Sequence, residues 1–242
     1  MESITPGHRI FEHSPGDGRH PGKLVLIFLG NFQPRGDEHA GLYKFAKTEA
    51  ENEGYEVITF RVGNLYQMVN EVAAPDSFHL HPDVVFTETR NTIMDRMQGR
   101  GAFAGLQPVT EVASESYSWG GGTHDLLFGK QDASEELLGS AKLKAAAYID
   151  AVSLKWGGPI SQRPAAEHFW NVYQEHDYKV HLLELMENAI PFVDVDVIRV
   201  VRGAEIAGTE NEQQNYGLTV DHENIDEIMV NLLWEHISEQ LE

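Results

Sequence analysis

The feature that most constrains the fold is an unbroken run of six apolar residues, Leu24–Leu29, which ends at Gly30. A strand with one face in water alternates apolar and polar residues, whereas a strand buried on both faces is apolar throughout. A strand of the second kind lies inside a sheet that other elements cover on both sides. The run therefore predicts a central strand of a largely parallel sheet.

The segments after this run alternate between helical and strand patterns. Residues 37–54 place apolar side chains at helical spacing and end at Gly54, which is typical of a helix C-terminus. Residues 55–62 have the pattern of a second strand. A strand, a helix and a strand in this order form a right-handed βαβ unit with parallel strands. The chain is therefore predicted to be an α/β protein whose mostly parallel central sheet is flanked by helices, a three-layer sandwich.

The remaining segments continue the alternation. Helices are expected over residues 88–104, 124–130, 165–190 and 224–241, and strands over residues 108–116, 142–154 and 192–201, the last as a half-exposed strand near a sheet edge. The domain boundaries follow from composition: an N-terminal arm over residues 1–22, which are rich in Gly, Pro and His, and a single domain over residues 23–242 with a cap insertion around residues 155–190.

Charge and composition exclude several classes of function. The chain has 18 basic and 38 acidic residues, a formal net charge of −20, which repels the phosphates of nucleic acids and of anionic membranes. No apolar stretch is long enough to span a membrane. The absence of cysteine excludes disulfides, a thiolate nucleophile and a thiolate metal site. The N-terminus lacks the pattern of a signal peptide, so a cytoplasmic protein is expected unless a leader has been removed.

The sequence SESYSWGGGTHDLL, residues 114–127, breaks a local rule where a strand passes into a helix. Glycine costs about 0.8–1.0 kcal/mol relative to alanine inside a helix, so Gly120, Gly121 and Gly122 make a poor first turn. A rule broken in this way is most often broken for function or for very close packing. This turn from strand to helix at Ser118, called the corner below, is therefore a candidate functional site.

The corner is similar to the nucleophile elbow of the α/β-hydrolase superfamily, in which a strand, a sharp turn with a serine and a helix follow one another as G-x-S-x-G. Here residues 116–120 have the sequence S-Y-S-W-G, with Ser116 where the family has glycine. The resemblance extends over most of residues 23–241 and implies the α/β-hydrolase fold. It also implies that Ser118 is a nucleophile whose hydroxyl is exposed at the turn. The alternative is an ordinary turn with a helix-capping serine.

The resemblance further implies an acid and a base downstream of the serine. Asp150 ends the buried strand AAAYID, and some lipase-like members take their acid from the end of that strand. His222 lies in a polar loop before the last helix, where the family places its catalytic histidine, and the neighbouring Asp221 and Glu223 favour its protonated form. Ser118, Asp150 and His222 are therefore the expected triad. The alternatives are a turn aspartate that accepts a backbone hydrogen bond and a helix-start histidine without chemistry.

The oxyanion hole of this superfamily uses two backbone N–H groups. The resemblance assigns one to Trp119, which follows the serine. It assigns the other to the loop FLGNFQ after the first long strand, at Asn31, or at Phe32 if the alignment shifts by one residue. Leu29 stands where the family often has histidine. The alternative for this loop is that Gly30 only ends the strand.

Neither a cofactor nor a metal is expected. His79 and His81 in FHLHP have no carboxylate at metal-ligand spacing. The other histidines are assigned by position: His124 beside the elbow, His168 and His176 in the cap, and His236 near the apolar face of the last helix.

Two functions remain open at this stage. The first is a serine hydrolase that cleaves a carboxylic ester, or a thioester, of a small molecule through an acyl-enzyme. The second is a non-catalytic α/β-hydrolase-like protein that binds a ligand or a partner. Four aromatic residues in the expected cap favour an apolar or aromatic acyl group, unless they belong to the core: Phe169, Trp170, Tyr173 and Tyr178. The sequence does not indicate an oligomeric state.

Overall fold

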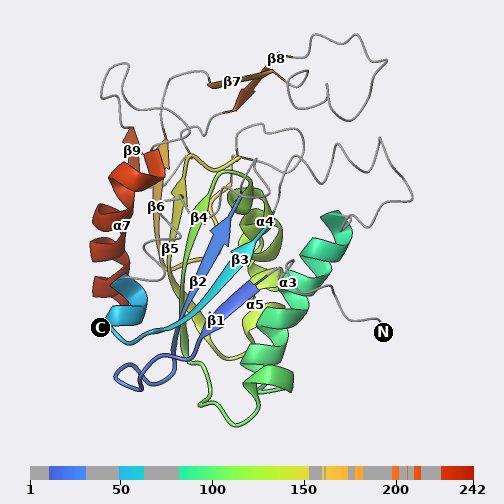
Figure 1. Cartoon of the computed structure of the whole chain (residues 1–242), viewed down its shortest axis with the longest axis vertical. Helices are drawn as coiled ribbons and strands as arrows, with labels where there is room; N and C mark the ends of the chain where they lie inside the picture. Colours follow the sequence, from blue (N-terminus) through green and yellow to red (C-terminus); the bar gives the residue numbers. More distant parts are fainter. Residues whose placement is uncertain are drawn as a thin grey trace.

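Figure 1 shows a computed structural model of the chain, which describes residues 11–30, 49–62, 82–152, 160, 162–173, 178–181, 198–201, 206, 210–213 and 225–242. A seven-stranded sheet runs through the centre in the order β1-β3-β2-β4-β5-β6-β9. Its strands are β1 (Phe11–Ser14), β2 (Lys23–Leu29), β3 (Glu56–Arg61), β4 (Glu111–Tyr117), β5 (Lys142–Ile149), β6 (His168–Tyr173) and β9 (Glu210–Gln213). Only β1 is antiparallel to its neighbour, so the sheet is mostly parallel, as predicted.

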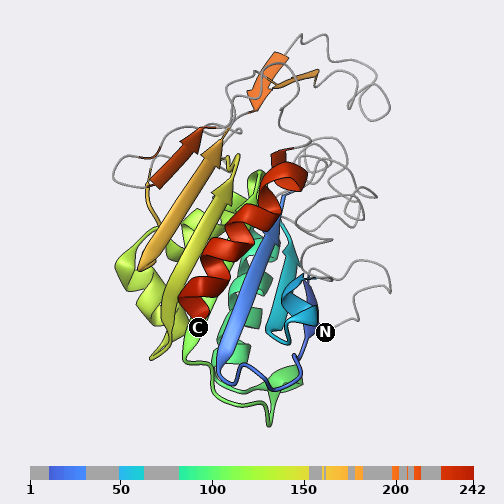
Figure 2. The same ribbon diagram turned by 90° about the vertical axis from the view of Figure 1, so that its left-hand side faces the viewer.

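Helices cover both faces of this sheet. One face is covered by α3 (Pro82–Met97), α4 (Trp119–Phe128) and α5 (Gln131–Leu138), and a short 3-10 helix (Gly101–Phe103) follows α3. The other face is covered by α7 (Ile225–Leu241). Figures 1 and 2 show the sheet between these two layers. The predicted α/β three-layer sandwich is confirmed.

The core explains why these segments form these elements. Residues 24–29 of β2 are fully or almost fully buried, because β2 lies between β3 and β4 with helices on both sides. Alternate residues of each strand contribute to two apolar clusters, one under α3, α4 and α5 and one under α7. In β5 the small side chains of Ala145, Ala146 and Ala147 are fully buried and leave room for the helices to approach the sheet.

One helix prediction was wrong. Residues 168–173 were expected in a helix over residues 165–190, but they form β6, which pairs in parallel with β5. Phe169 and Trp170 point into opposite core clusters, one under each helical layer, so they belong to the main sheet and not to a cap. The residues HFWNVY are rich in aromatic and β-branched types that favour strands, and the alanines before them gave a misleading helical spacing.

The N-terminal arm is also shorter than predicted. Residues 11–14, which we placed in an arm without a core, form β1 and pair antiparallel with β3. Phe11 contacts the core cluster under α3, and its ring lies 6.3 Å from the ring of Phe103. An antiparallel edge strand can be short, because it needs partners on one side only.

Two further strands lie apart from the main sheet. β7 (Tyr178–His181) pairs antiparallel with β8 (Ile198–Val201), so the predicted strand at residues 192–201 is confirmed for its last four residues, although it joins a separate two-stranded sheet. Figure 1 shows this pair beyond the carboxyl ends of the parallel strands. Of the helix predicted over residues 37–54, only its end is described: the backbone is helical at residues 49–52 and stops at Gly54, whose φ is 88°.

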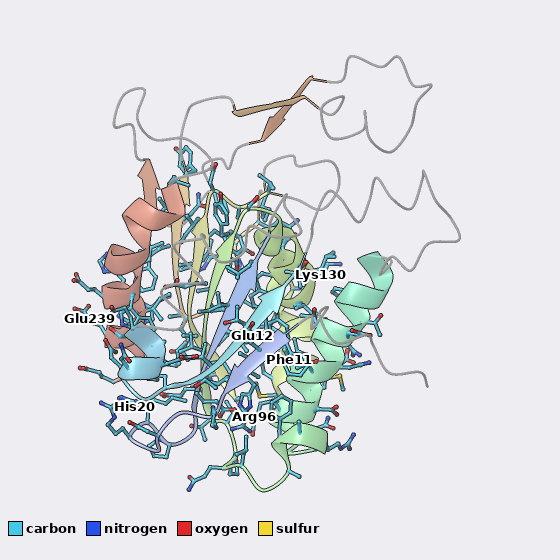
Figure 3. The ribbon with its side chains drawn as sticks, in the orientation of Figure 1. Phe11, Glu12, His20, Arg96, Lys130 and Glu239 are labelled. Carbon is cyan, nitrogen blue, oxygen red and sulfur yellow. The ribbon has the colours of Figure 1, made fainter. Side chains whose placement is uncertain are left out.

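A buried ion pair closes the amino edge of the sheet. Arg96, which Figure 3 labels at the lower end of α3, is 2 % exposed and donates to both carboxylate oxygens of Glu56 at 2.5 and 2.6 Å. His13 lies 2.9 Å from the same carboxylate, and the two partners hold the pKa of Glu56 below its usual range although burial opposes them. The cluster joins β1, β3 and α3 at the edge opposite the carboxyl ends of the strands.

Candidate functional site

A single residue, Ser118, separates the end of β4 at Tyr117 from the start of α4 at Trp119. Its backbone angles are φ 53° and ψ −124°, a region that residues other than glycine rarely adopt. Such a conformation costs on the order of 1–3 kcal/mol and persists only where the surrounding structure imposes it. It occurs preferentially at functional sites, so the corner that the sequence indicated is the candidate site.

Backbone hydrogen bonds impose this conformation. The Ser118 N–H donates to the carbonyl of Ile149 on β5 at 3.2 Å. The Ser118 carbonyl accepts from the N–H of Gly121 at 3.1 Å and from the N–H of Val152 at 2.9 Å. The corner is therefore tied to its own helix and to the end of the neighbouring strand.

The glycines after Ser118 are explained by close packing. A Cβ atom on Gly120 would lie 2.1 Å from the carbonyl oxygen of Phe28 on β2, and a Cβ on Gly121 would lie 2.3 Å from the Cβ of Ala151. Both distances are far below van der Waals contact. The first turn of α4 therefore passes directly over the ends of β2 and β5, as expected from the sequence, and only glycine fits there.

We expect Gly120→Ala to destabilise the protein by about 3 kcal/mol, because the new methyl group must displace the backbone of β2. At an open helix position the same change would stabilise by about 0.8–1.0 kcal/mol, so the sign of the effect is the test. Urea unfolding followed by tryptophan fluorescence measures it. An unchanged or increased free energy of unfolding would show that α4 does not pack on β2 in this way.

Asp150 lies at the end of the strand next to Ser118. Tyr117 and Ile149 are paired across β4 and β5, so Ser118 and Asp150 each follow a paired residue at the carboxyl edge of the sheet. Asp150 also has a positive φ, of 43°, and its N–H donates to the carbonyl of Val172 on β6 at 2.7 Å. Among the described residues these two are the only ones other than glycine with a positive φ. The structure therefore brings together the strand ends that bear two of the three predicted triad residues.

Both side chains are buried. Ser118 and Asp150 are 0 % exposed, whereas the resemblance to a nucleophile elbow implied an exposed hydroxyl. The difference has a physical reason, because the corner lies between the end of β2, the end of β5 and the first turn of α4. A carboxylate and a hydroxyl removed from water interact more strongly with nearby charges than they would at the surface.

Of the predicted oxyanion-hole residues and the predicted base, the structure describes only Trp119. Trp119 is the first residue of α4, where the N–H groups have no acceptor within the helix. Gly30 donates its N–H to the carbonyl of Tyr117 at 3.2 Å, so its N–H is occupied. Asn31, Phe32 and His222 lie outside the described residues. His222 belongs to residues 214–224, which join the carboxyl end of β9 to the start of α7.

A serine–histidine pair that was not predicted from the sequence lies below the corner. Ser114 Oγ lies 2.7 Å from His124 Nε2, and His124 Nδ1 lies 3.1 Å from the hydroxyl of Tyr148. All three side chains are fully buried, and burial lowers the pKa of His124 to about 3, so its ring is neutral. The signal in the sequence was the alternation of β4, which points Ser114 and Ser116 toward the same helical layer. The partner on α4 could not be identified without the packing of the helix.

Other histidines fall away from the corner. His236 stacks on the ring of Trp170 at 5.3 Å, in agreement with its assignment to the apolar face of the last helix. His168 begins β6 and therefore lies at the amino edge, not in a cap. His79, His81 and His176 lie outside the described residues. Within the described part of the chain, no group of three or more His, Asp or Glu residues is arranged to hold a metal.

No helix among the described residues is long and apolar enough to cross a membrane.

Comparison with known proteins gives structural similarity only. No family model and no curated protein matches the sequence. A metagenome-derived lipolytic enzyme matches with 14 % identity over 98 % of this chain and 99 % of its own, with a TM-score of 0.47. An esterase from Lactobacillus rhamnosis matches with 12 % identity over 93 % and 77 %, and a TM-score of 0.47. A lipase/esterase from Lactobacillus plantarum matches with 11 % identity over 89 % and 86 %, and a TM-score of 0.46.

Proposed function

We propose that this chain is a serine hydrolase of the α/β-hydrolase superfamily that cleaves a carboxylic ester or a thioester of a small molecule. The observation that carries the proposal is the backbone of Ser118, which holds a left-handed φ between β4 and the glycine-rich first turn of α4. An ordinary turn with a capping serine does not need this strain, and the Ser118 side chain makes no helix-capping hydrogen bond. A strained serine that begins a helix is suited to nucleophilic attack, because the helix N-terminus stabilises negative charge.

The proposed reaction follows from these positions. His222 removes the proton from Ser118 Oγ, which attacks the substrate carbonyl carbon and forms a bond to it. The N–H groups of Trp119 and Asn31 donate to the oxyanion. His222 returns the proton to the leaving alcohol or thiol as its bond to the acyl carbon breaks. Water, deprotonated by His222, then releases the acid and restores Ser118, while Asp150 orients and stabilises the protonated His222.

The nature of the acyl group has less support than the sequence suggested. Phe169 and Trp170 belong to the core, so they no longer favour an apolar acyl group. Tyr178 begins β7, and the β7–β8 pair lies beyond the carboxyl ends of the strands, where a cap would cover the substrate (Figure 1). Because residues 168–173 of the predicted cap insertion around residues 155–190 form β6, we retain a cap only for the chain that follows β6. An apolar or aromatic acyl group is its expected ligand.

Labelling with a fluorophosphonate probe tests the proposal, since only an activated serine displaces fluoride from the probe. We expect the wild type to be labelled and Ser118→Ala and His222→Ala to remain unlabelled. Ser114→Ala is the matched control, because Ser114 is the serine that already has a histidine within hydrogen-bond distance. Loss of labelling in Ser114→Ala but not in Ser118→Ala would show that Ser114, and not Ser118, is the nucleophile.

The second candidate is a non-catalytic protein with the same fold that binds a ligand or a partner. The complete burial of Ser118 and Asp150 favours it, because a nucleophile must be reached by its substrate. The same experiment decides between the two. A folded wild type that is not labelled, and that hydrolyses no p-nitrophenyl or thioester substrate, would support the binding protein.

A further inference from the structure

Three buried polar side chains form a chain of hydrogen bonds beneath the corner. His124 occupies the centre: its Nε2 lies 2.7 Å from Ser114 Oγ and its Nδ1 lies 3.1 Å from the Tyr148 hydroxyl. Aromatic rings surround it, since the rings of Phe28 and Phe128 lie 5.3 and 4.7 Å away. Aromatic rings therefore pack around the central histidine of the polar chain.

The three residues come from the three elements that define the candidate site. Ser114 is on β4, four residues before Ser118, and His124 is on α4, which begins directly after Ser118. Tyr148 is on β5, two residues before Asp150. Above the chain, backbone hydrogen bonds tie Ser118 to the end of β5. The corner is thus fixed by the backbone hydrogen bonds of Ser118 and by the polar chain that joins β4, α4 and β5 beneath it.

Stability alone is a poor explanation for this arrangement. The hydrogen bonds among a buried imidazole and two hydroxyls do little more than offset the cost of removing these groups from water, and apolar side chains of similar size can be equally stable. A fully satisfied polar chain instead favours one geometry over its neighbours, because each bond is lost when an element shifts. Here one geometry means one position of β4, β5 and α4 relative to each other.

We propose that His124 is a positioning residue, which fixes the Ser118 corner and the Asp150 strand end relative to each other through Ser114 and Tyr148. The inference rests on the proposed function, because it assigns the fixed geometry to the serine hydrolase reaction. His124 itself does not reach the substrate. It acts through the two strands that it joins.

The chemistry of the three groups fits a fixed role. Burial keeps the pKa of His124 far below neutrality and raises the pKa of Tyr148 well above its usual range, with the nearby Asp125 adding to the second effect. Neither His124 nor Tyr148 changes its protonation state in the pH range in which a hydrolase is assayed. One nitrogen of the neutral ring donates and the other accepts, and each hydroxyl supplies the matching role. The hydrogen bonds of His124 therefore do not depend on a change in its own protonation or in that of Tyr148.

Two variants that remove one hydroxyl each, Tyr148→Phe and Ser114→Ala, test the proposal with a p-nitrophenyl ester. We expect each to lower kcat about fivefold to tenfold, with an unchanged KM and an unchanged midpoint of the pH–rate profile. The rate of fluorophosphonate labelling should fall by the same factor, while every folded molecule is still labelled at completion. Tyr55→Phe is the matched control, because Tyr55 is also a fully buried tyrosine of the core but lies at the amino edge. It should leave kcat at the wild-type value.

The outcomes separate this inference from the proposed function. If both variants keep the wild-type kcat and only lose stability, the chain is structural and the positioning role is wrong, whereas the hydrolase stands. If the pH–rate midpoint moves, the chain takes part in proton transfer and the positioning role is also wrong. If the folded wild type neither hydrolyses nor is labelled, the proposed function fails and this inference fails with it. His124→Gln, which keeps a group near the Nε2 position, should retain more kcat than His124→Phe if the Ser114 bond matters.

Discussion

A Ser118→Gly variant is expected to lose hydrolytic activity by about three orders of magnitude or more and yet to unfold at a higher temperature than the wild type. The loss follows because the variant lacks the proposed nucleophile. The gain follows because glycine adopts a φ of 53° and a ψ of −124° without the steric cost that serine has there. Relief of this strain is worth about 1 kcal/mol or more, which corresponds to a rise in Tm of about 2–4 °C for a chain of this size.

Ser118→Ala is the matched variant for this prediction. Alanine removes the hydroxyl but keeps a Cβ atom, so the activity should fall as far as in Ser118→Gly without the gain in Tm. Thermal unfolding and ester hydrolysis, measured on the same preparations, give both quantities. Equal Tm values for the two variants would mean that the backbone at residue 118 is not strained. Activity that survives in both variants would remove Ser118 as the nucleophile.

Much of the fold could be predicted because local patterns and tertiary structure agree. The apolar run of β2 and the alanine-rich β5 are buried on both faces, and such strands are visible in the sequence without knowledge of their neighbours. The amphipathic pattern at residues 224–241 likewise predicted α7 to within one residue. These elements are long and strongly patterned, and their type does not depend on what they contact.

The elements that were missed depend on their partners. β1 is four residues long and exists because β3 offers it an open edge, which no local pattern in residues 11–14 reveals. β6 follows a segment of alanines with helical spacing, and it becomes a strand because β5 and β9 bind it on both sides. In both cases tertiary hydrogen bonding overrides a weak local preference.

The site shows the same division. Ser118 and the glycines could be found because the required backbone geometry restricts which residue types fit at the corner. Asp150 could be placed near Ser118 because parallel strands end at the same edge of a sheet. The contact between Ser114 and His124 could not be predicted, because it depends on how α4 is rotated about its axis over the sheet. The role of His222 stays a prediction from the resemblance.

A Glu115→Gln variant is expected to abolish a large pH effect on the stability of this chain. Glu115 is on β4, between Ile27 and Ala147 on the face covered by α7, and it is fully buried. Neither of its carboxyl oxygens has a hydrogen-bond partner in the described structure. Burial therefore raises the pKa of Glu115 to about 8, and the folded protein keeps this carboxyl protonated at neutral pH.

The direction of the effect follows from the two pKa values. In the unfolded chain a glutamate loses its proton near its ordinary pKa of about 4.3, whereas in the folded chain Glu115 keeps its proton until about pH 8. Between these values the folded state binds more protons, so the free energy of unfolding falls as the pH rises. The full loss is on the order of 5 kcal/mol, which is a large share of the stability of a typical domain.

Urea unfolding of the wild type and of Glu115→Gln at intervals from pH 5 to 8.5 measures this effect. The amide cannot ionise, so the variant should be more stable than the wild type at pH 8.5, and its advantage should shrink steadily as the pH falls toward 5. Repulsion among the other acidic residues acts on both proteins and cancels in the difference. Glu111→Gln removes the same charge from the start of the same strand, where the residue is partly exposed, and should give a difference that hardly changes with pH. If the difference for Glu115→Gln is equally flat, the carboxyl is ionised in the folded state and must have found a cation or water to stabilise it.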